Sequence, residues 1–77
     1  MTVTVKFFAS LREEVGHNEL QFNIDNSLTI EEIWFKACGK MPLPPHILMA
    51  INMQYVDKTA LVNMGDEVAF FPPVTGG

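Results

Sequence analysis

The residues of this chain best suited to chemistry are the last two, Gly76 and Gly77. Glycine has no Cβ, so a narrow channel can close around this backbone and the α-carboxylate of Gly77 is sterically accessible. That carboxylate is ionised at neutral pH and is a weak nucleophile toward an activated phosphate such as the α-phosphorus of ATP. The resulting mixed anhydride exposes the acyl carbon to sulfur or amine nucleophiles. We therefore predict that the Gly77 carboxylate is the reacting group.

Two prolines join this glycine pair to the body of the chain, in the sequence Pro72-Pro73-Val74-Thr75-Gly76-Gly77. Neither proline can donate a hydrogen bond to a sheet, and each fixes φ near the polyproline value. Residues 72–77 are therefore predicted to project from the domain as a tail. At about 3.3 Å per residue the tail reaches at most roughly 20 Å, which is long enough to enter the active site of another protein.

The other reactive side chains do not form a catalytic or metal-binding set in the sequence. Cys38 has no neighbouring cation or base that would activate its thiol, so we expect it to be structural. His17 and His46 are far apart and lack a cysteine or carboxylate at ligand spacing, so no metal site is predicted. We expect a protein that binds no cofactor and is not catalytic by itself.

The composition predicts one small domain, residues 1–77. The chain has 77 residues, of which 48% are hydrophobic and 18% charged, so it folds but cannot hold two cores. Its net charge is −4, which disfavours nucleic acid and anionic membranes as partners. The sequence has no signal peptide or membrane-span pattern and a single cysteine, so we expect a cytoplasmic protein.

Hydrophobic periodicity predicts a mixture of strands and helices. Alternation of apolar residues indicates strands, and Thr29 with Glu32 has the spacing of a helix capping box. Prolines at positions 42, 44 and 45 exclude regular structure there. The expected elements are a strand over residues 2–8, a short helix over 9–15, a strand over 20–24, a main helix from Thr29 to Gly39, a strand over 47–51, a minor strand at 55–56 and a last strand over 68–71.

This order predicts an α+β sheet packed on one main helix, which can cover only one face of the sheet. Phe8 and Phe71 alternate away from the covered face, so we expect them on the open side, where a partner can bind. Phe70 is also assigned to the predicted partner-binding set, although its place in the alternation favours the core. The apolar surplus of the chain is consistent with such a binding surface.

Two segments resemble a known family. Gly65-Asp66-Glu67-Val68-Ala69-Phe70-Phe71-Pro72-Pro73-Val74-Thr75-Gly76-Gly77 resembles the end of the small subunits of molybdopterin synthase, which are ubiquitin-like sulfur carriers. Val5-Lys6-Phe7-Phe8-Ala9-Ser10-Leu11-Arg12-Glu13 resembles their first strand and turn. Residues 36–60 fit only loosely, and the proline-containing segment is the clearest departure.

The resemblance implies a β-grasp fold with a flexible C-terminal Gly-Gly tail, and a reaction cycle. A partner adenylating enzyme would activate Gly77 with ATP, and a sulfur donor protein would convert it to a thiocarboxylate. The tail would then enter the large synthase subunit and give its sulfur to a pterin precursor of molybdenum cofactor. The Gly77 carboxylate would thereby be regenerated.

Other functions remain open from the sequence. A protein modifier would use the same adenylate but transfer Gly77 to a lysine amine as an isopeptide. A sulfur carrier for thiamine or another thio-compound would also end in Gly-Gly. A pure binding module with an inert tail is the remaining alternative.

Overall fold

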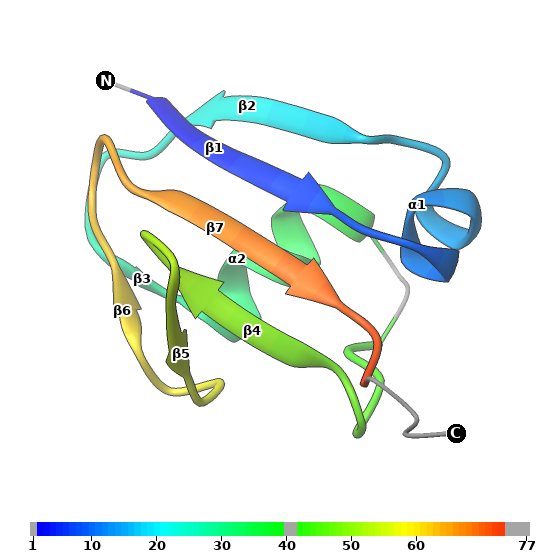
Figure 1. Cartoon of the computed structure of the whole chain (residues 1–77). Coiled ribbons are helices and arrows are strands. Elements are labelled where there is room, and N and C mark those ends of the chain that lie inside the picture. Colours follow the sequence, from blue (N-terminus) through cyan, green and yellow to red (C-terminus); the bar gives the residue numbers. More distant parts are fainter. Residues whose placement is uncertain (1, 40–41, 74–77) are drawn as a thin grey trace.

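Figure 1 shows a computed structural model of the chain, which describes residues 2–39 and 42–73. Pro72 and Pro73 of the predicted tail are therefore described, whereas Val74, Thr75, Gly76 and Gly77 lie outside the described residues. The elements in chain order are β1 (Thr2–Phe7), α1 (Ser10–Val15), β2 (Glu19–Asn23), β3 (Leu28–Thr29), α2 (Ile30–Cys38), β4 (Leu48–Ile51), β5 (Gln54–Val56), β6 (Leu61–Val62) and β7 (Glu67–Phe71).

Five strands form a mixed sheet in the order β2-β1-β7-β4-β5. β1 and β7 run parallel, with Val5 opposite Val68, and the other neighbouring strands are antiparallel. The first and last strands of the chain thus lie side by side, and β7 is central (Figure 1). The mixed sheet with one main helix confirms the predicted α+β architecture.

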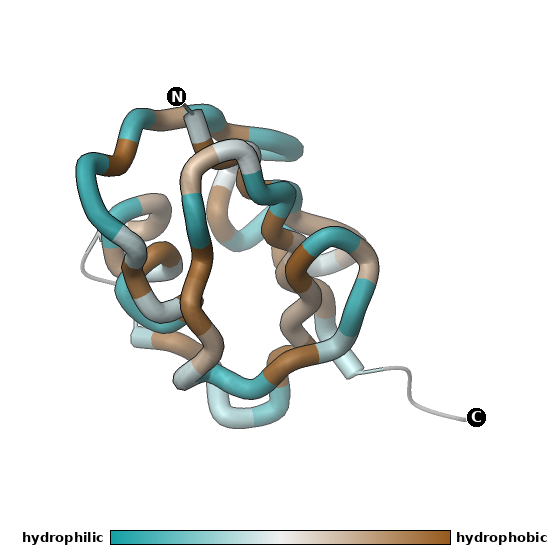
Figure 2. Tube along the Cα trace, turned by 90° about the vertical axis from the view of Figure 1, so that its left-hand side faces the viewer, coloured by the Kyte–Doolittle hydropathy of each residue, from teal (hydrophilic) through white to brown (hydrophobic). Residues whose placement is uncertain are grey.

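The helix α2 covers one face of this sheet, and the core lies between the two layers (Figure 2). Trp34 of α2 is fully buried and contacts the rings of Phe70, with centroids 4.9 Å apart, and Phe7, with centroids 6.0 Å apart. Val3, Val5 and Val68 are also fully buried, as the alternation in β1 and β7 predicts. Among the described residues, no helix lies on the opposite face of the sheet (Figure 1).

Local sequence signals set the ends of both helices. The Glu32 N–H donates to Thr29 Oγ1 at 3.2 Å, and Glu32 Oε1 accepts from the Thr29 N–H at 2.9 Å, so the predicted capping box is confirmed. α1 ends at Gly16, whose φ of 87° and ψ of 10° are left-handed and favour glycine. None of the helices in residues 2–39 and 42–73 combines the length and apolarity needed to cross a membrane.

The structure adds a two-stranded sheet, β3 with β6, that the sequence did not predict. Each strand has only two residues, which is too short for a period of two to be recognised. The backbone pairing of this small sheet extends into the first residue of α2, where the Ile30 N–H donates to the Ala60 carbonyl at 2.9 Å. The first strand also ends at Phe7, one residue earlier than expected.

Candidate functional site

The chain leaves the sheet from its central strand. Phe71, the last residue of β7, is opposite Leu48 of β4, and on the other side the Phe8 N–H donates to the Phe70 carbonyl at 3.1 Å. β7 is therefore paired on both sides up to Phe70, and on the β4 side up to Phe71. Pro72 is half-buried and Pro73 is exposed. The predicted tail therefore begins directly after the last residue of β7.

An apolar depression of about 250 Å³ lies beside this exit, on the face of the sheet that α2 does not cover. This face is turned toward the reader in Figure 1. We call the depression the open-face groove. Its lining residues come from the segment just after β1, from the whole length of β7 and from the β4–β5 hairpin: Phe8, Ala50, Met53, Tyr55, Glu67, Ala69 and Phe71.

Three aromatic rings form a row in the open-face groove. The ring of Phe71 is in the middle, with its centroid 6.3 Å from that of Phe8 and 5.7 Å from that of Tyr55. The Phe8 ring meets Phe71 edge-on at 83°, a favourable arrangement for two aromatic quadrupoles. Phe8 and Tyr55 nevertheless remain 47% and 73% exposed, so most of the Tyr55 surface faces solvent.

Two alanines make the floor of the groove. Ala50 of β4 is directly opposite Ala69 of β7, and on its other side it is opposite Tyr55 of β5. Ala50 is only 6% exposed although it belongs to the open face. Small residues at these positions let the neighbouring aromatic rings close over the sheet, which makes the depression.

Polar residues border the groove on the β1 side. The Lys6 Nζ lies 3.5 Å from Glu67 Oε2, and both side chains are partly exposed. An exposed ion pair of this kind contributes little to stability. The apolar part of the open face thus lies beside the exit of the chain, and the groove is polar where Glu67 meets Lys6 of β1.

The position of Phe70 corrects one sequence prediction. Its side chain is 0% exposed and packs against Trp34 and Phe7 beneath the helix, so it cannot contact a partner and belongs to the core. Phe8 and Phe71 lie on the open face as expected, and their role in partner binding remains a prediction.

Sequence reasoning missed Tyr55 and the alanine floor. Tyr55 reaches the groove because Asn52 and Met53, both with positive φ, make a two-residue turn that places it opposite Ala50. The Asn52 side chain fixes this turn, since its Nδ2 donates to Asp66 and its Oδ1 accepts from the Glu67 N–H. The register of the β4–β5 hairpin could therefore have placed Tyr55 opposite Ala50. It could place Tyr55 in the groove only once the position of β7 beside β4 was known.

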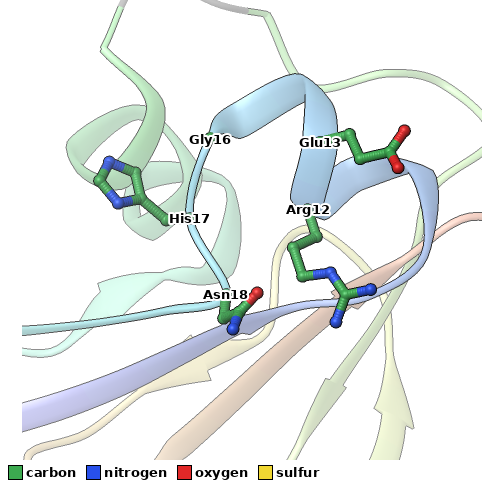
Figure 3. Close-up of a pocket in the computed structure, with 5 residues that line it drawn as sticks. All are labelled: Arg12, Glu13, Gly16, His17 and Asn18. Atoms are coloured by element: carbon green, nitrogen blue, oxygen red, sulfur yellow. The ribbon is translucent and has the colours of Figure 1, made fainter.

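In the part of the chain that the structure describes, the remaining reactive groups are not gathered into a second catalytic or metal-binding cluster. Figure 3 shows a polar depression in which the Arg12 and Asn18 side chains lie near each other, while Glu13 and His17 point away. Burial raises the pKa of the Cys38 thiol to about 11. Within residues 2–39 and 42–73, no three histidine, cysteine or carboxylate side chains are grouped to hold a metal ion.

Comparison with known proteins identifies the family. The model of the ThiS family matches residues 5–77. The chain belongs to the ThiS family. Among the curated relatives, the molybdopterin synthase sulfur carrier subunit of Haemophilus influenzae is 38% identical over 85 aligned positions, covering 97% of this chain and 99% of the relative.

Solved structures confirm the predicted β-grasp fold for this ThiS family member. SAMP1, small archaeal modifier protein 1, from Haloferax volcanii matches with a TM-score of 0.78 and 26% identity, over 100% of both chains. A chain in the complex of subunits 1 and 2 of molybdopterin-converting factor from Helicobacter pylori matches with a TM-score of 0.63 and 19% identity, over 100% of both chains. At that identity the second match shows the fold alone.

Proposed function

We propose that this chain is the sulfur carrier subunit of a molybdopterin synthase. The proposal is supported by family membership and by the end-to-end similarity to the Haemophilus influenzae sulfur carrier subunit. The observation that carries it is structural: the segment that ends in Gly76-Gly77 starts at the central strand, directly beside an exposed apolar groove. A partner that receives the tail must also cover the surface next to the exit.

The proposed chemistry takes place at the carboxylate of Gly77. An oxygen of this carboxylate attacks the α-phosphorus of ATP in a partner adenylating enzyme, and pyrophosphate leaves. Sulfur at the sulfide level, supplied by a donor protein, then attacks the acyl carbon and displaces AMP, which gives a thiocarboxylate. The pterin precursor in the large subunit takes up that sulfur, and water supplies the oxygen that replaces it at the acyl carbon, so the carboxylate is returned. ATP is used by the partner, and this chain itself holds no cofactor in the proposal.

The body of the protein presents the tail in this scheme. Gly76 and Gly77 let a narrow channel close on the backbone, and Pro72 and Pro73 keep the tail away from the sheet. Val74 and Thr75 connect the two pairs. Phe8 and Phe71, with Tyr55, offer the large subunit an apolar surface of the kind that supplies binding energy at interfaces. We place all these steps in the cytoplasm.

Intact-mass spectrometry tests the proposal directly. The purified chain is incubated with its adenylating enzyme, ATP and a sulfur donor. We expect the mass of the free chain to rise by the difference between one sulfur and one oxygen atom. Deletion of Gly77, or extension of the chain beyond it, is expected to abolish this change without altering the melting temperature. Normal loading of either variant would refute the proposal.

The archaeal modifier among the structural relatives favours one second function, that of a protein modifier. In that case a lysine amine replaces sulfur as the nucleophile, and Gly77 ends in an isopeptide bond. The same mass analysis separates the two functions. A sulfur carrier gains sulfur as a free chain, whereas a modifier appears joined to larger proteins, with Gly77 linked to lysine in their tryptic peptides.

A further inference from the structure

The aromatic row of the open-face groove is attached to the residue from which the tail departs. Phe71 is the last residue of β7, and its ring contacts Phe8 on one side and Tyr55 on the other. These contacts come from two distant segments of the chain, the end of β1 and the β4–β5 hairpin. The row therefore holds the side chain of Phe71 from both directions in the isolated protein.

We propose that Phe8 and Tyr55 are positioning residues that act through Phe71 and set the direction in which the tail leaves the body. The proposal rests on the proposed function and assigns to these two rings a role beyond contact with a partner. It concerns the free chain, in which the row is already assembled before any partner binds.

The chemistry of the connection explains how a ring contact can orient the tail. The residue after Phe71 is Pro72 and the next is Pro73, and both have φ fixed by their rings. A proline pair is a short, stiff spacer, so the orientation of Phe71 is passed on with little loss. A tail whose first two residues already leave the body in one direction loses less conformational entropy when it is inserted into an active site, which favours the productive complex.

The alanine floor shows why Tyr55 can reach this position. Ala50 and Ala69 lie opposite each other between the hairpin and β7, and neither side chain extends beyond one methyl group. The Tyr55 ring can therefore cross over β4, the strand between β5 and β7, and meet Phe71 at a tilt of 58°. A larger residue in this pair would separate the two rings.

Docking and positioning give different kinetics. If the rings only dock a partner, their loss raises KM and leaves kcat unchanged, because a saturating partner restores the complex. If they orient the tail, kcat falls even at saturation. An aromatic pair is worth about 0.5–1.5 kcal/mol, so each truncation is expected to lower kcat for sulfur loading about two- to tenfold.

The variants for this experiment are Phe8→Ala and Tyr55→Ala, measured as initial rates of sulfur loading against the concentration of the chain. Tyr55→Phe keeps the ring and is expected to keep the wild-type kcat. Phe35→Ala is the matched control, since Phe35 is 46% exposed, like Phe8, but lies on α2 on the other side of the sheet. Met53→Ala removes an exposed groove residue that has no ring and is expected to raise KM only.

A partner-free measurement makes the outcome decisive. The backbone order parameter of the Phe71 amide, from ¹⁵N relaxation of the free chain, is expected to fall in Tyr55→Ala and to return in Tyr55→Phe. An unchanged order parameter, or a kcat that stays at the wild-type value in both alanine variants, would overturn the positioning role. Failure of the wild-type chain to load sulfur would instead count against the proposed function, and the relaxation result would still decide for or against positioning.

Discussion

At the scale of single residues, the proposed reaction and the recognition surface are carried by different kinds of residue. The reaction is assigned to a backbone carboxylate at Gly77 and needs no side chain of this protein. Recognition is assigned to rings on the open face, of which Tyr55 is the most exposed. The role of the terminal glycines could be predicted from the sequence, because it depends on the absence of a side chain. Tyr55 could not, because its role depends on a neighbour in space.

Cys38 is the one cysteine of the chain, so it is the side chain to test for a role in relaying sulfur. Its thiol packs partly against the core, and burial raises its pKa to about 11 from an ordinary 9.0. Two pKa units correspond to a thiolate fraction that is roughly a hundredfold smaller at neutral pH. The thiolate is the nucleophile, so this residue is poorly suited to accept or pass on sulfur.

We therefore predict that Cys38→Ala loads sulfur at Gly77 at the wild-type rate. Alkylation of the wild-type thiol by iodoacetamide near pH 8 should be much slower in the folded chain than in urea. The raised pKa also means that Cys38 stabilises the fold below about pH 9 and loses this effect as the pH rises toward 11. Rapid alkylation of the folded chain, or loss of loading in Cys38→Ala, would contradict this assignment.

At the scale of elements, the helix and the longer strands follow from local signals. The alternation in β1 and β7 and the capping box of α2 act within a few residues, so the sequence displays them directly. The β3–β6 pair could not be predicted, because its two strands are held by contacts between residues more than thirty positions apart, such as Leu28 with Val62. The side of α2 that packs on the sheet carries Ile30, Ile33 and Trp34, which have the spacing of one helix face and are all fully buried.

The capping box of α2 allows a test of pH dependence. Hydrogen bonds from the Thr29 backbone and hydroxyl lower the pKa of Glu32. A carboxylate whose pKa is lower in the folded state stabilises the fold above its ordinary pKa, and this stabilisation is lost as the pH falls. We expect the difference in melting temperature between the wild type and Glu32→Gln to be present at pH 7 and to shrink below about pH 4.5.

Thr29→Ala serves as the companion variant, because it removes the hydroxyl that accepts from the Glu32 N–H. It is expected to lower the free energy of unfolding by about 1 kcal/mol at pH 7. Urea denaturation measures this value, and circular dichroism follows the pH series. A Glu32→Gln difference that persists unchanged at pH 3 would show that the charge of Glu32 has no part in capping the helix.

At the scale of the whole molecule, the two faces of one sheet have separate tasks. The face under α2 holds the buried aromatic cluster, and the open face holds the groove beside the exit of the chain. The composition indicated more apolar side chains than so small a domain can bury, and the groove accounts for part of that surplus. Such a division lets a binding surface change without loss of the core.

Phe70 and Phe71 test this division with adjacent residues of the same type on opposite faces of β7. Phe70 is fully buried against Trp34, so Phe70→Ala is expected to lower the free energy of unfolding by about 3–5 kcal/mol. Phe71 is half-buried and packs against the exposed rings of Phe8 and Tyr55, so Phe71→Ala should cost about 1 kcal/mol. Urea denaturation distinguishes these values.

The expected order is reversed for binding to the large synthase subunit, measured by isothermal titration calorimetry. Phe71→Ala removes the central ring of the proposed interface and is expected to weaken affinity at least tenfold, as truncation of a buried interface aromatic commonly does. Phe70→Leu keeps the core filled well enough to stay folded and should bind like the wild type, because its side chain does not reach the open face. Equal losses of affinity in both variants would mean that the partner does not recognise the open face, and that the surface beside the tail is not where the two proteins meet.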